Sequence, residues 1–313
     1  MRIRLCTRRR CALLMTSLAL AVCLWRAGAV ARISNRSLRR SPDELIAIWG
    51  LCGLSDDVLL VACGSDGLRA LRLSSAQLCA RDPSALKHVL NAALDAASGI
   101  LLLAFVAHTD DVVWLVSLQC VADEWREVQR VQTQCTFSYM WLGLSFAGDS
   151  RVLCGQWHED RLYAFDVSAE RHLRPVSDVV LDDKLWRFAC TRLGGDSLVA
   201  IADAGHTCVS VQRLVGAGDS LRLEPLARTA LEGAFNVLFR GDQLLVATIS
   251  KSVVSFGVSG GGLRSRRELL GAGAGFRAHC WCLAGDRLVV AEFGSEDLVL
   301  YEDAAPVQRQ RQT

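Results

Sequence analysis

One unit of roughly 40 to 50 residues recurs along the chain, and this repetition constrains the fold more than any other feature. The unit contains a turn, a β-rich run, a second polar turn and another β-rich run. Six copies are clear, at residues 55–73, 97–118, 148–167, 195–214, 241–258 and 285–301. Their first strongly apolar residues are separated by 42, 52, 46, 46 and 44 positions. Such a period is typical of sheets of four short strands arranged around an axis.

Strands can be assigned within each unit. A Gly-Asp pair comes directly before four of the β-rich runs and predicts a tight hairpin turn. Apolar runs before this turn, such as "WGLCGL" (49–54) and "CWCL" (280–283), are predicted as the innermost strand A. The Gly-Asp turn is then the A-B hairpin, the second polar turn is the B-C turn, and "EWREVQRVQ" (124–132) is an outer strand D. The chain is therefore predicted to be an all-β β-propeller, and only residues 82–94 show a short helical period.

The predicted propeller has six clear four-stranded blades in residues 41–313. Seven blades result if residues 1–40 form a degenerate first blade, because residues 17–34 align with the repeat that follows them. Residues 1–40 contain no Asp or Glu, whereas every clear unit has one at a turn, and this difference favours six blades. If the last blade lacks a strand after Tyr301, the N-terminal segment has to supply it.

The first forty residues also resemble a leader. A basic stretch, a 15-residue apolar run and Ala29-Val30-Ala31 form the pattern of a secretory signal cleaved near Ala31. The apolar run is too short for a membrane span, which takes about 20 residues. The chain has 13 cysteines, and most of those outside this segment lie in apolar runs, which favours a reduced, intracellular (cytoplasmic) protein. The alternatives are a secreted protein and an upstream extension of the reading frame.

The charge of the chain is unevenly distributed. Residues 1–40 hold ten of the 35 basic residues, so the remainder carries 25 basic against 33 acidic groups. A body of this sign lacks the clustered Lys and Arg that bind a phosphate backbone. Nucleic acid is therefore not an expected partner.

From Leu45 to Tyr301 the chain resembles the Trp-Asp repeat and YVTN-like class of β-propellers. The resemblance lies in the period, the Gly-Asp-x-Leu-Val-Val-Ala start of strand B, and the runs "DRLYAFDVSA" and "EDLVLYEDAA". No Trp is followed by Asp, and the Gly205-His206 pair falls in a B-C turn, so the hydrogen-bonded tetrad of that family is not carried over. The resemblance implies a non-enzymatic scaffold that binds a protein or peptide through one face, although some propellers are hydrolases or lyases.

The B-C turns carry most of the candidate binding residues, because five of the six are acidic. An electronegative ring of this kind would attract a basic peptide or a cation. Acidic residues also populate turns for their backbone hydrogen bonds, and the opposite A-B turns are acidic too. The predicted partner-binding residues are Asp110, Asp111, Trp157, His158, Glu159, Asp160, Glu296 and Asp297.

No catalytic motif, cofactor motif or metal-ligand spacing is present in the sequence. Cys280 and Cys282 flank Trp281 on one strand and are interpreted as core residues. An enzyme would have to use side chains near the start of strand A: Arg187, Asn236, Arg277 and His279. Aromatic residues recur there as well and are interpreted as packing between blades: Trp49, Trp141, Phe188, Phe235 and Phe276.

The favoured function is thus a monomeric, non-enzymatic interaction scaffold without cofactor or metal. The alternative is a secreted, lactonase-like hydrolase whose site lies at the mouth of the central channel.

Overall fold

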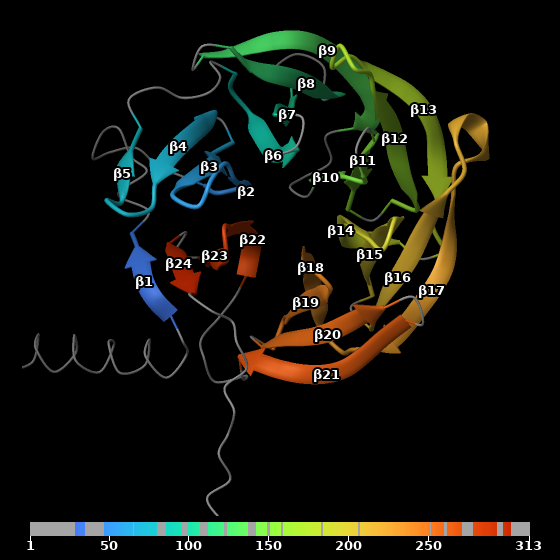
Figure 1. Cartoon of the computed structure of the whole chain (residues 1–313). Helices are drawn as coiled ribbons and strands as arrows, with labels where there is room; N and C mark the ends of the chain where they lie inside the picture. Colours follow the sequence, from blue (N-terminus) through green and yellow to red (C-terminus); the bar gives the residue numbers. More distant parts are fainter. Residues whose placement is uncertain are drawn as a thin grey trace, which may run out of the picture.

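The structure is a computed structural model, and it describes residues 29–34, 47–64, 66–79, 86–95, 99–106, 112–121, 124–136, 142–148, 151–157, 159–182, 184–205, 207–250, 252–259, 262–270, 278–292 and 297–301. In this part of the chain the strands form six four-stranded antiparallel sheets. The sheets surround a central axis as the blades of a six-bladed β-propeller, as the repeat predicts (Figure 1).

The first three blades follow the chain in order. Blade 1 contains β2 (Gly50–Gly53), β3 (Val58–Ala62), β4 (Leu68–Arg72) and β5 (Gln77–Leu78). Blade 2 contains β6 (Val89–Asp95), β7 (Ile100–Val106), β8 (Val112–Val121) and β9 (Glu124–Thr136). Blade 3 contains β10 (Leu142–Phe146), β11 (Arg151–Gln156), β12 (Arg161–Val167) and β13 (Leu173–Val180).

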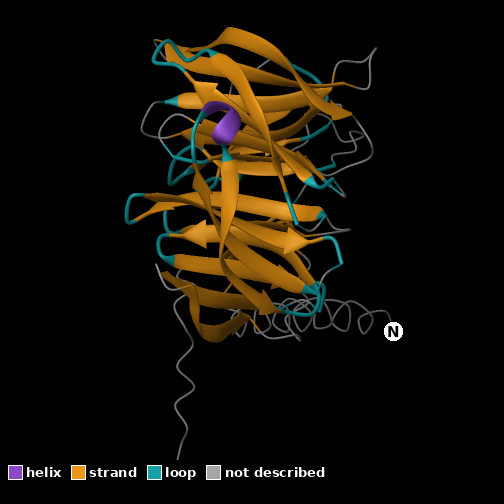
Figure 2. Cartoon of the chain, turned by 90° about the vertical axis from the view of Figure 1, so that its right-hand side faces the viewer, coloured by secondary structure: helices purple, strands orange, loops and turns teal. Residues whose placement is uncertain are grey.

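The next two blades have the same order of strands. Blade 4 contains β14 (Leu185–Leu193), β15 (Asp196–Asp203), β16 (Cys208–Val215) and β17 (Arg222–Ala230), with a short 3-10 helix, η2 (Gly218–Ser220), before its last strand (Figure 2). Blade 5 contains β18 (Ala234–Arg240), β19 (Gln243–Thr248), β20 (Val253–Ser259) and β21 (Gly262–Leu270).

Blade 6 joins the two ends of the chain. Its inner strands are β22 (Ala278–Ala284), β23 (Arg287–Glu292) and β24 (Leu298–Tyr301), and its outermost strand is β1 (Ala29–Ile33). β1 pairs antiparallel with β24, from Ala29 opposite Tyr301 to Ile33 opposite Leu298. β1 lies in the segment that the sequence interpretation separated from the propeller, and it takes part in the sixth blade rather than in a seventh. Residues 1–28 lie outside the described part.

The apolar runs of the repeat form a core at each junction between blades. Successive side chains of a strand point to opposite faces. In β3, Leu59 and Val61 pack toward blade 6, whereas Leu60 and Ala62 pack toward blade 2. Within the described residues each of the six junctions has one such cluster. Strand B is buried on both sides for this reason, and its sequence is continuously apolar instead of alternating.

In blades 5 and 6 the Gly-Asp pairs form the A-B hairpins as predicted, whereas in blade 4 Leu193 pairs with Asp196 and the turn is Gly194-Gly195. Arg240 pairs with Gln243 and Ala284 with Arg287, which leaves Gly-Asp as the two-residue turn between them. Gly241 and Gly285 both have φ of +59°, a conformation that glycine adopts without steric cost.

The helical period over residues 82–94 does not give a helix where the structure describes it. Val89–Asp95 is β6, the innermost strand of blade 2, and pairs with β7. Hydrogen bonds to β7 and burial between blades outweigh a weak local preference for helix. Within the described residues, no helix has the length and apolar character that a membrane span requires.

Candidate functional site

The strand order gives the ring two different faces. Strand A runs from the D-A loop to the A-B turn, so the B-C turns and D-A loops share one end, called here the B-C face. The opposite end carries the A-B and C-D turns and is called the A-B face. The predicted partner-binding residues all belong to B-C turns.

A row of aromatic side chains crosses the B-C face. Trp157 follows β11 in blade 3, Trp186 is the second residue of β14 in blade 4, and Phe235 is the second residue of β18 in blade 5. The Trp157 and Trp186 rings meet edge to face at 5.2 Å between centroids, and those of Trp186 and Phe235 lie 5.4 Å apart. All three side chains are partly exposed. These residues are called the aromatic row.

Ile249 extends the aromatic row. It lies in the B-C turn of blade 5, and its backbone N–H donates to the carbonyl of Gly233 at 2.7 Å, two residues before Phe235. Its side chain is 53% exposed, although isoleucine is normally among the most buried residue types. The apolar surface therefore spans the B-C ends of blades 3, 4 and 5.

Glu159 and Asp160 adjoin the row in the same turn as Trp157. The Glu159 carbonyl accepts from the N–H of Leu185, and the Asp160 carbonyl accepts from that of Leu181, both at 2.8 Å, so the turn is fixed to the loop that leads into blade 4. Burial raises the pKa of the Glu159 carboxyl, and a hydrogen bond with Tyr163 opposes part of that rise. The Asp160 side chain is 65% exposed and lies 3.7 Å from the guanidinium of Arg161.

The acidic B-C turns differ from one another. Asp203 is buried and accepts from the N–H groups of Thr207 and Cys208 at 2.9 and 2.8 Å. Burial pushes its pKa upward, but these hydrogen bonds outweigh burial and leave the pKa below its ordinary value. Asp203 is therefore a turn-forming residue, in agreement with the backbone interpretation of acidic turns.

The other predicted residues are placed only in part. Asp297 is described and pairs with Arg32 of β1 at 3.5 Å, and Arg32 also contacts Glu292. Asp110, Asp111, His158 and Glu296 lie outside the described residues. Of the predicted set, the structure thus brings together Trp157, Glu159 and Asp160, while Asp297 lies at the blade that closes the ring. Partner binding by this set stays a prediction.

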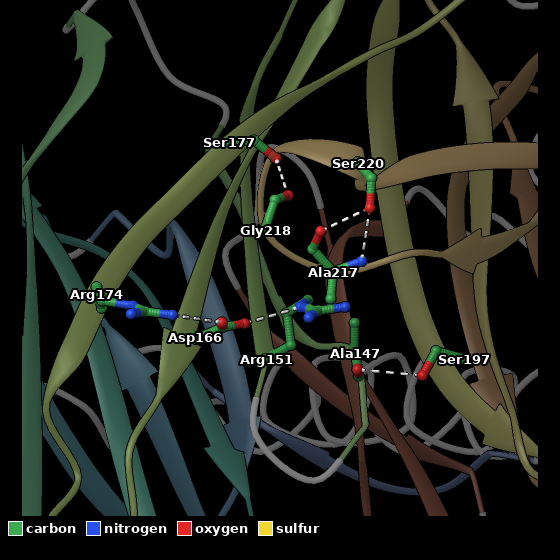
Figure 3. Close-up of polar contacts among 9 residues, drawn as sticks. All are labelled: Ala147, Arg151, Asp166, Arg174, Ser177, Ser197, Ala217, Gly218 and Ser220. Atoms are coloured by element: carbon green, nitrogen blue, oxygen red, sulfur yellow. Dashed lines mark hydrogen bonds and ion pairs between the residues drawn. The ribbon is translucent and has the colours of Figure 1, made fainter.

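The A-B face is cross-linked by polar contacts. Asp166 accepts from Arg151 at 3.0 Å and from Arg174 at 3.5 Å (Figure 3). The Ser197 hydroxyl of blade 4 donates to the Ala147 carbonyl of blade 3 at 3.3 Å, and Ser177 of blade 3 donates to Gly218 of blade 4 at 3.2 Å.

The innermost strands line a central cavity of about 330 Å³. One position on each strand A pairs with a small residue of strand B and lines this cavity, and these positions are Gly50, Asn91, Gly143, Arg187, Asn236 and Cys280. We call these six residues the channel ring. In four blades a β-bulge comes directly before the ring residue, and in blades 4 and 5 the bulged residues are Trp186 and Phe235.

The sequence interpretation missed Asn91. The helical period over residues 82–94 concealed strand β6, whereas Arg187 and Asn236 were anticipated although the same bulge precedes them. Trp49, Trp186 and Phe235 each come directly before the ring residue of their blade, whereas Phe188 lies two residues after Trp186 and packs between blades 3 and 4. Arg187 and Asn236 line the cavity as expected. Arg277 and the side chain of His279 lie outside the described part, as do Trp141 and Phe276.

Two ring side chains converge on one carbonyl of blade 3. The Leu142 carbonyl accepts from Asn91 Nδ2 at 2.9 Å and from Arg187 Nη1 at 3.3 Å. Glycine at position 143 leaves room for the Phe188 ring, because a Cβ there would lie 2.4 Å from it.

The thiols of the channel belong to the core. Cys280 and Cys282 pack toward blade 1 and Trp281 toward blade 5, as strand alternation predicts. Burial raises the pKa of Cys52 and of Cys190 to about 12, so both thiols stay protonated. In the described part of the chain, no group of three or more His, Cys, Asp and Glu side chains is arranged to hold a metal ion.

No protein-family model and no curated protein matches the chain. Solved structures of similar fold exist. A glucose dehydrogenase has a TM-score of 0.58 at 12% identity, over 82% of this chain and 96% of that one. The periplasmic gluconolactonase of Pseudomonas aeruginosa has a TM-score of 0.57 at 18% identity, over 80% of each chain. The Cps50 (Swd1) β-propeller domain of Myceliophteria thermophila has a TM-score of 0.52 at 14% identity, over 81% of this chain and 82% of that one. At these identities the similarity shows the fold alone.

Proposed function

We propose that this six-bladed propeller is a non-enzymatic interaction module that binds a protein partner through its B-C face. The aromatic row is the observation that carries the proposal. Partly exposed Trp and Phe side chains in mutual contact resemble the anchors that dominate binding energy at protein interfaces. Two of the three large apolar side chains exposed among the described residues, Val180 and Ile249, also lie at this face.

The charge around the row favours a partner with basic groups next to an apolar anchor. Asp160 is exposed beside Trp157, and Glu159 is half-buried and acidic. Opposite charges at the rim of an interface speed association and fix its orientation more than they add affinity. We therefore expect the aromatic row to set the affinity for the partner, and Glu159 and Asp160 to set how strongly association depends on salt.

The test compares the two faces of the ring. A partner is captured with the full chain, identified, and its dissociation constant is measured for the wild type, Trp157→Ala, Ile249→Asp and Asp160→Lys. We expect Trp157→Ala and Ile249→Asp to weaken binding at least tenfold, because each removes or interrupts the apolar anchor. Asp160→Lys should slow association and flatten its salt dependence.

Val121→Asp is the matched control, because Val121 is 38% exposed at the A-B face. Unchanged affinity in both anchor variants, or equal loss in the control, would remove the B-C face as the binding surface.

A second candidate is a small-molecule enzyme with its site at the channel mouth. The 330 Å³ cavity supports it, since pockets for small ligands begin at about this size. Turnover of sugar lactones by the purified full chain, lost on substitution of Asn236, would favour it. A complete lack of turnover together with partner binding would favour the interaction module.

We also propose that the protein works in a reducing, intracellular compartment. The ten cysteines of the described part are free thiols, and six of them are buried inside the junctions between blades as small hydrophobes. The alternative cleavage near Ala31 would cut within β1 and detach Ala29–Ala31 from β24. Sequencing the mature N-terminus and titrating thiols in denaturant test this; a start at Arg32 would contradict it.

A further inference from the structure

Three arginines lie close together on the outermost strand of blade 5. This strand, β21, forms the rim of the ring in that blade (Figure 1). It carries Arg264, Arg266 and Arg267, and all three residues are exposed. Residues 41–313 hold 25 basic against 33 acidic groups, so β21 is a local excess of positive charge on a net acidic body.

The ion pairs of these arginines differ from those on other outer strands. In the part of the chain that the structure describes, no acidic side chain pairs with Arg264, Arg266 or Arg267. On the outer strands of blades 2, 3 and 4, four exposed arginines do have acidic partners, in the pairs Arg126–Glu124, Arg130–Glu127, Arg174–Asp166 and Arg222–Glu224. A carboxylate that approaches β21 from outside therefore displaces none of the ion pairs of the described residues.

A β-bulge brings two of the arginines to one face of the sheet. Arg264 lies opposite Gly257 of β20 and Arg267 lies opposite Ser255, so two residues of β21 stand opposite one residue of β20 between them. In a regular strand, residues three positions apart point to opposite faces. The bulge reverses this, because Gly257 and Ser255 are two positions apart and directly opposite residues share a face.

The backbone of the bulge is strained. Ser265, which separates Arg264 from Arg266, has a φ of +53°. This conformation is uncommon for residues other than glycine, and glycine is usual at such a bulge position. Strain of this kind costs free energy and clusters at ligand-binding sites. Here its structural effect is to align Arg264 with Arg267.

The shared face of the two arginines is turned toward blade 6. Val253 of β20 packs in the junction with blade 6, whereas Val254 and Phe256 pack toward blade 4, so Ser255 and Gly257 lie on the blade 6 side. Two residues of a strand span roughly 7 Å. This is also the separation of every second side chain in an extended segment, so two carboxylates at alternate positions of such a segment match the two guanidiniums.

We propose that β21 binds an acidic, extended segment of a protein partner, with carboxylates at alternate positions on Arg264 and Arg267. The guanidinium presents its donors in a planar fork that fits a carboxylate bidentately. A nucleic acid would carry its phosphates past the acidic remainder of the surface, where like charges repel it. The aromatic row uses Phe235 of β18, the innermost strand of the same blade, so the two surfaces are separate.

Arginines and bulges on an outer strand also prevent its edge from pairing with other chains. That protection needs positive charge, whereas bidentate binding of a carboxylate needs the guanidinium itself. Replacement of arginine by lysine therefore separates the two roles.

The experiment titrates the full chain into a labelled peptide of about ten residues in which Glu and Thr alternate, so that alternate side chains carry the carboxylates. Fluorescence anisotropy gives the dissociation constant. We expect saturable binding that weakens at least threefold between low salt and about 0.15 M salt, because exposed ion pairs are screened. A peptide with Gln in place of Glu should not bind. Equal binding of the two peptides would overturn the proposal, as would the absence of binding by the Glu peptide.

Arg264→Gln combined with Arg267→Gln should weaken binding of the Glu peptide at least fivefold. Arg126→Gln combined with Arg174→Gln is the matched control, because it removes the same charge from exposed positions on other outer strands. The control should change the dissociation constant less than twofold. Equal weakening in both double variants would show general charge attraction and would overturn the site.

Two further variants keep the charge of the chain. Arg264→Lys combined with Arg267→Lys should weaken binding at least threefold, and wild-type affinity there would show that charge alone suffices, against the proposal. Arg267→Glu combined with Glu268→Arg keeps the composition but moves the arginine to the face of Val254, toward blade 4. This exchange should weaken binding as much as the double Gln variant, and retained affinity would contradict the role of the bulge. Unfolding temperatures confirm that each variant is folded.

The last comparison separates this surface from other binding modes. Trp157→Ala should bind the Glu peptide as the wild type does, since the aromatic row takes no part, and an equal loss would place the peptide at the B-C face instead. A single-stranded oligonucleotide of similar length is the second probe. Tighter arginine-dependent binding of the oligonucleotide than of the peptide would overturn the assignment to an acidic protein segment.

Discussion

The two faces of the propeller use similar residue types differently. At the A-B face, acids pair with arginines and serines of the same or the next blade, as in the Arg151, Asp166 and Arg174 group and the Ser197 contact with Ala147. At the B-C face of blades 3 to 5, aromatic side chains are partly exposed in contact with one another, and a half-buried Glu159 has a raised pKa. The A-B face pairs these charged groups internally, whereas the B-C face of blades 3 to 5 has partly exposed aromatic area beside Glu159 and Asp160. A count of acidic turns in the sequence cannot distinguish them.

The largest loss of stability is expected for a substitution at Gly53, where the A-B ends of blades 1 and 6 meet. A Cβ on Gly53 would lie 2.0 Å from the Leu283 carbonyl, so Gly53→Ala must push two backbones apart. We expect a loss of about 3 kcal/mol in the free energy of unfolding, measured by guanidinium denaturation. Gly257→Ala is the control, because its nearest atom would be the Arg264 carbonyl at 3.7 Å, an ordinary contact. Equal stability of the two variants would show that the A-B end is less tightly packed than described.

A smaller loss of stability is expected at Arg32, which pairs with the acidic residues Glu292 and Asp297 at the B-C face. Arg32→Ala leaves Glu292 and Asp297, whose side chains are only 15% and 19% exposed, without this cation. The expected loss is about 1 kcal/mol, since the pair is partly screened by solvent. Arg174→Ala, in which a 78% exposed side chain is truncated, should change stability by less than about 0.5 kcal/mol. A cost at Arg174 equal to that at Arg32 would contradict the assignment.

Glu159→Gln tests the acidity of the B-C face. Burial raises the folded pKa of Glu159, so the wild type is most stable with this carboxyl protonated and loses stability as the pH rises through that pKa. The variant has no such loss. We expect it to be more stable than the wild type at pH 7, by up to about 0.5 kcal/mol after solvent screening, and equal to it at pH 4. A less stable variant at pH 7 would indicate that Glu159 is fully satisfied.

Asp57→Asn should give the smallest change in stability, and at pH 7 this change should be a loss, opposite in sign to that of Glu159→Gln. A hydrogen bond from the Ser74 hydroxyl lowers the pKa of Asp57 at the A-B face, with a further contribution from Arg72. Its stabilising contribution is present above the unfolded pKa and is lost as the pH falls through the folded one. The unfolding temperature of the variant should therefore fall slightly below that of the wild type at pH 7 and converge with it in acid. Opposite pH trends in these two variants would support the contrast between the faces, whereas parallel trends would remove it.

The sequence predicts the blades better than the site. Period, Gly-Asp turns and apolar runs place strands A, B, C and D correctly, because each depends on local patterning that repeats. Strand β6, and Asn91 within it, was hidden by the helical period over residues 82–94. The aromatic row is formed by three residues from three blades, and their contacts depend on the angle between sheets, which no local pattern encodes.

The closing strand has a mechanical consequence. Ala29 pairs directly with Tyr301, so the two ends of the described propeller are neighbours in one sheet, while Arg32 and Asp297 are 265 positions apart in sequence. Tension applied through the ends acts on the β1 and β24 ladder one residue pair at a time, as on a zipper. The seam between the termini therefore opens before the other five blades bear load, and the force needed to open it sets how long the ring stays closed.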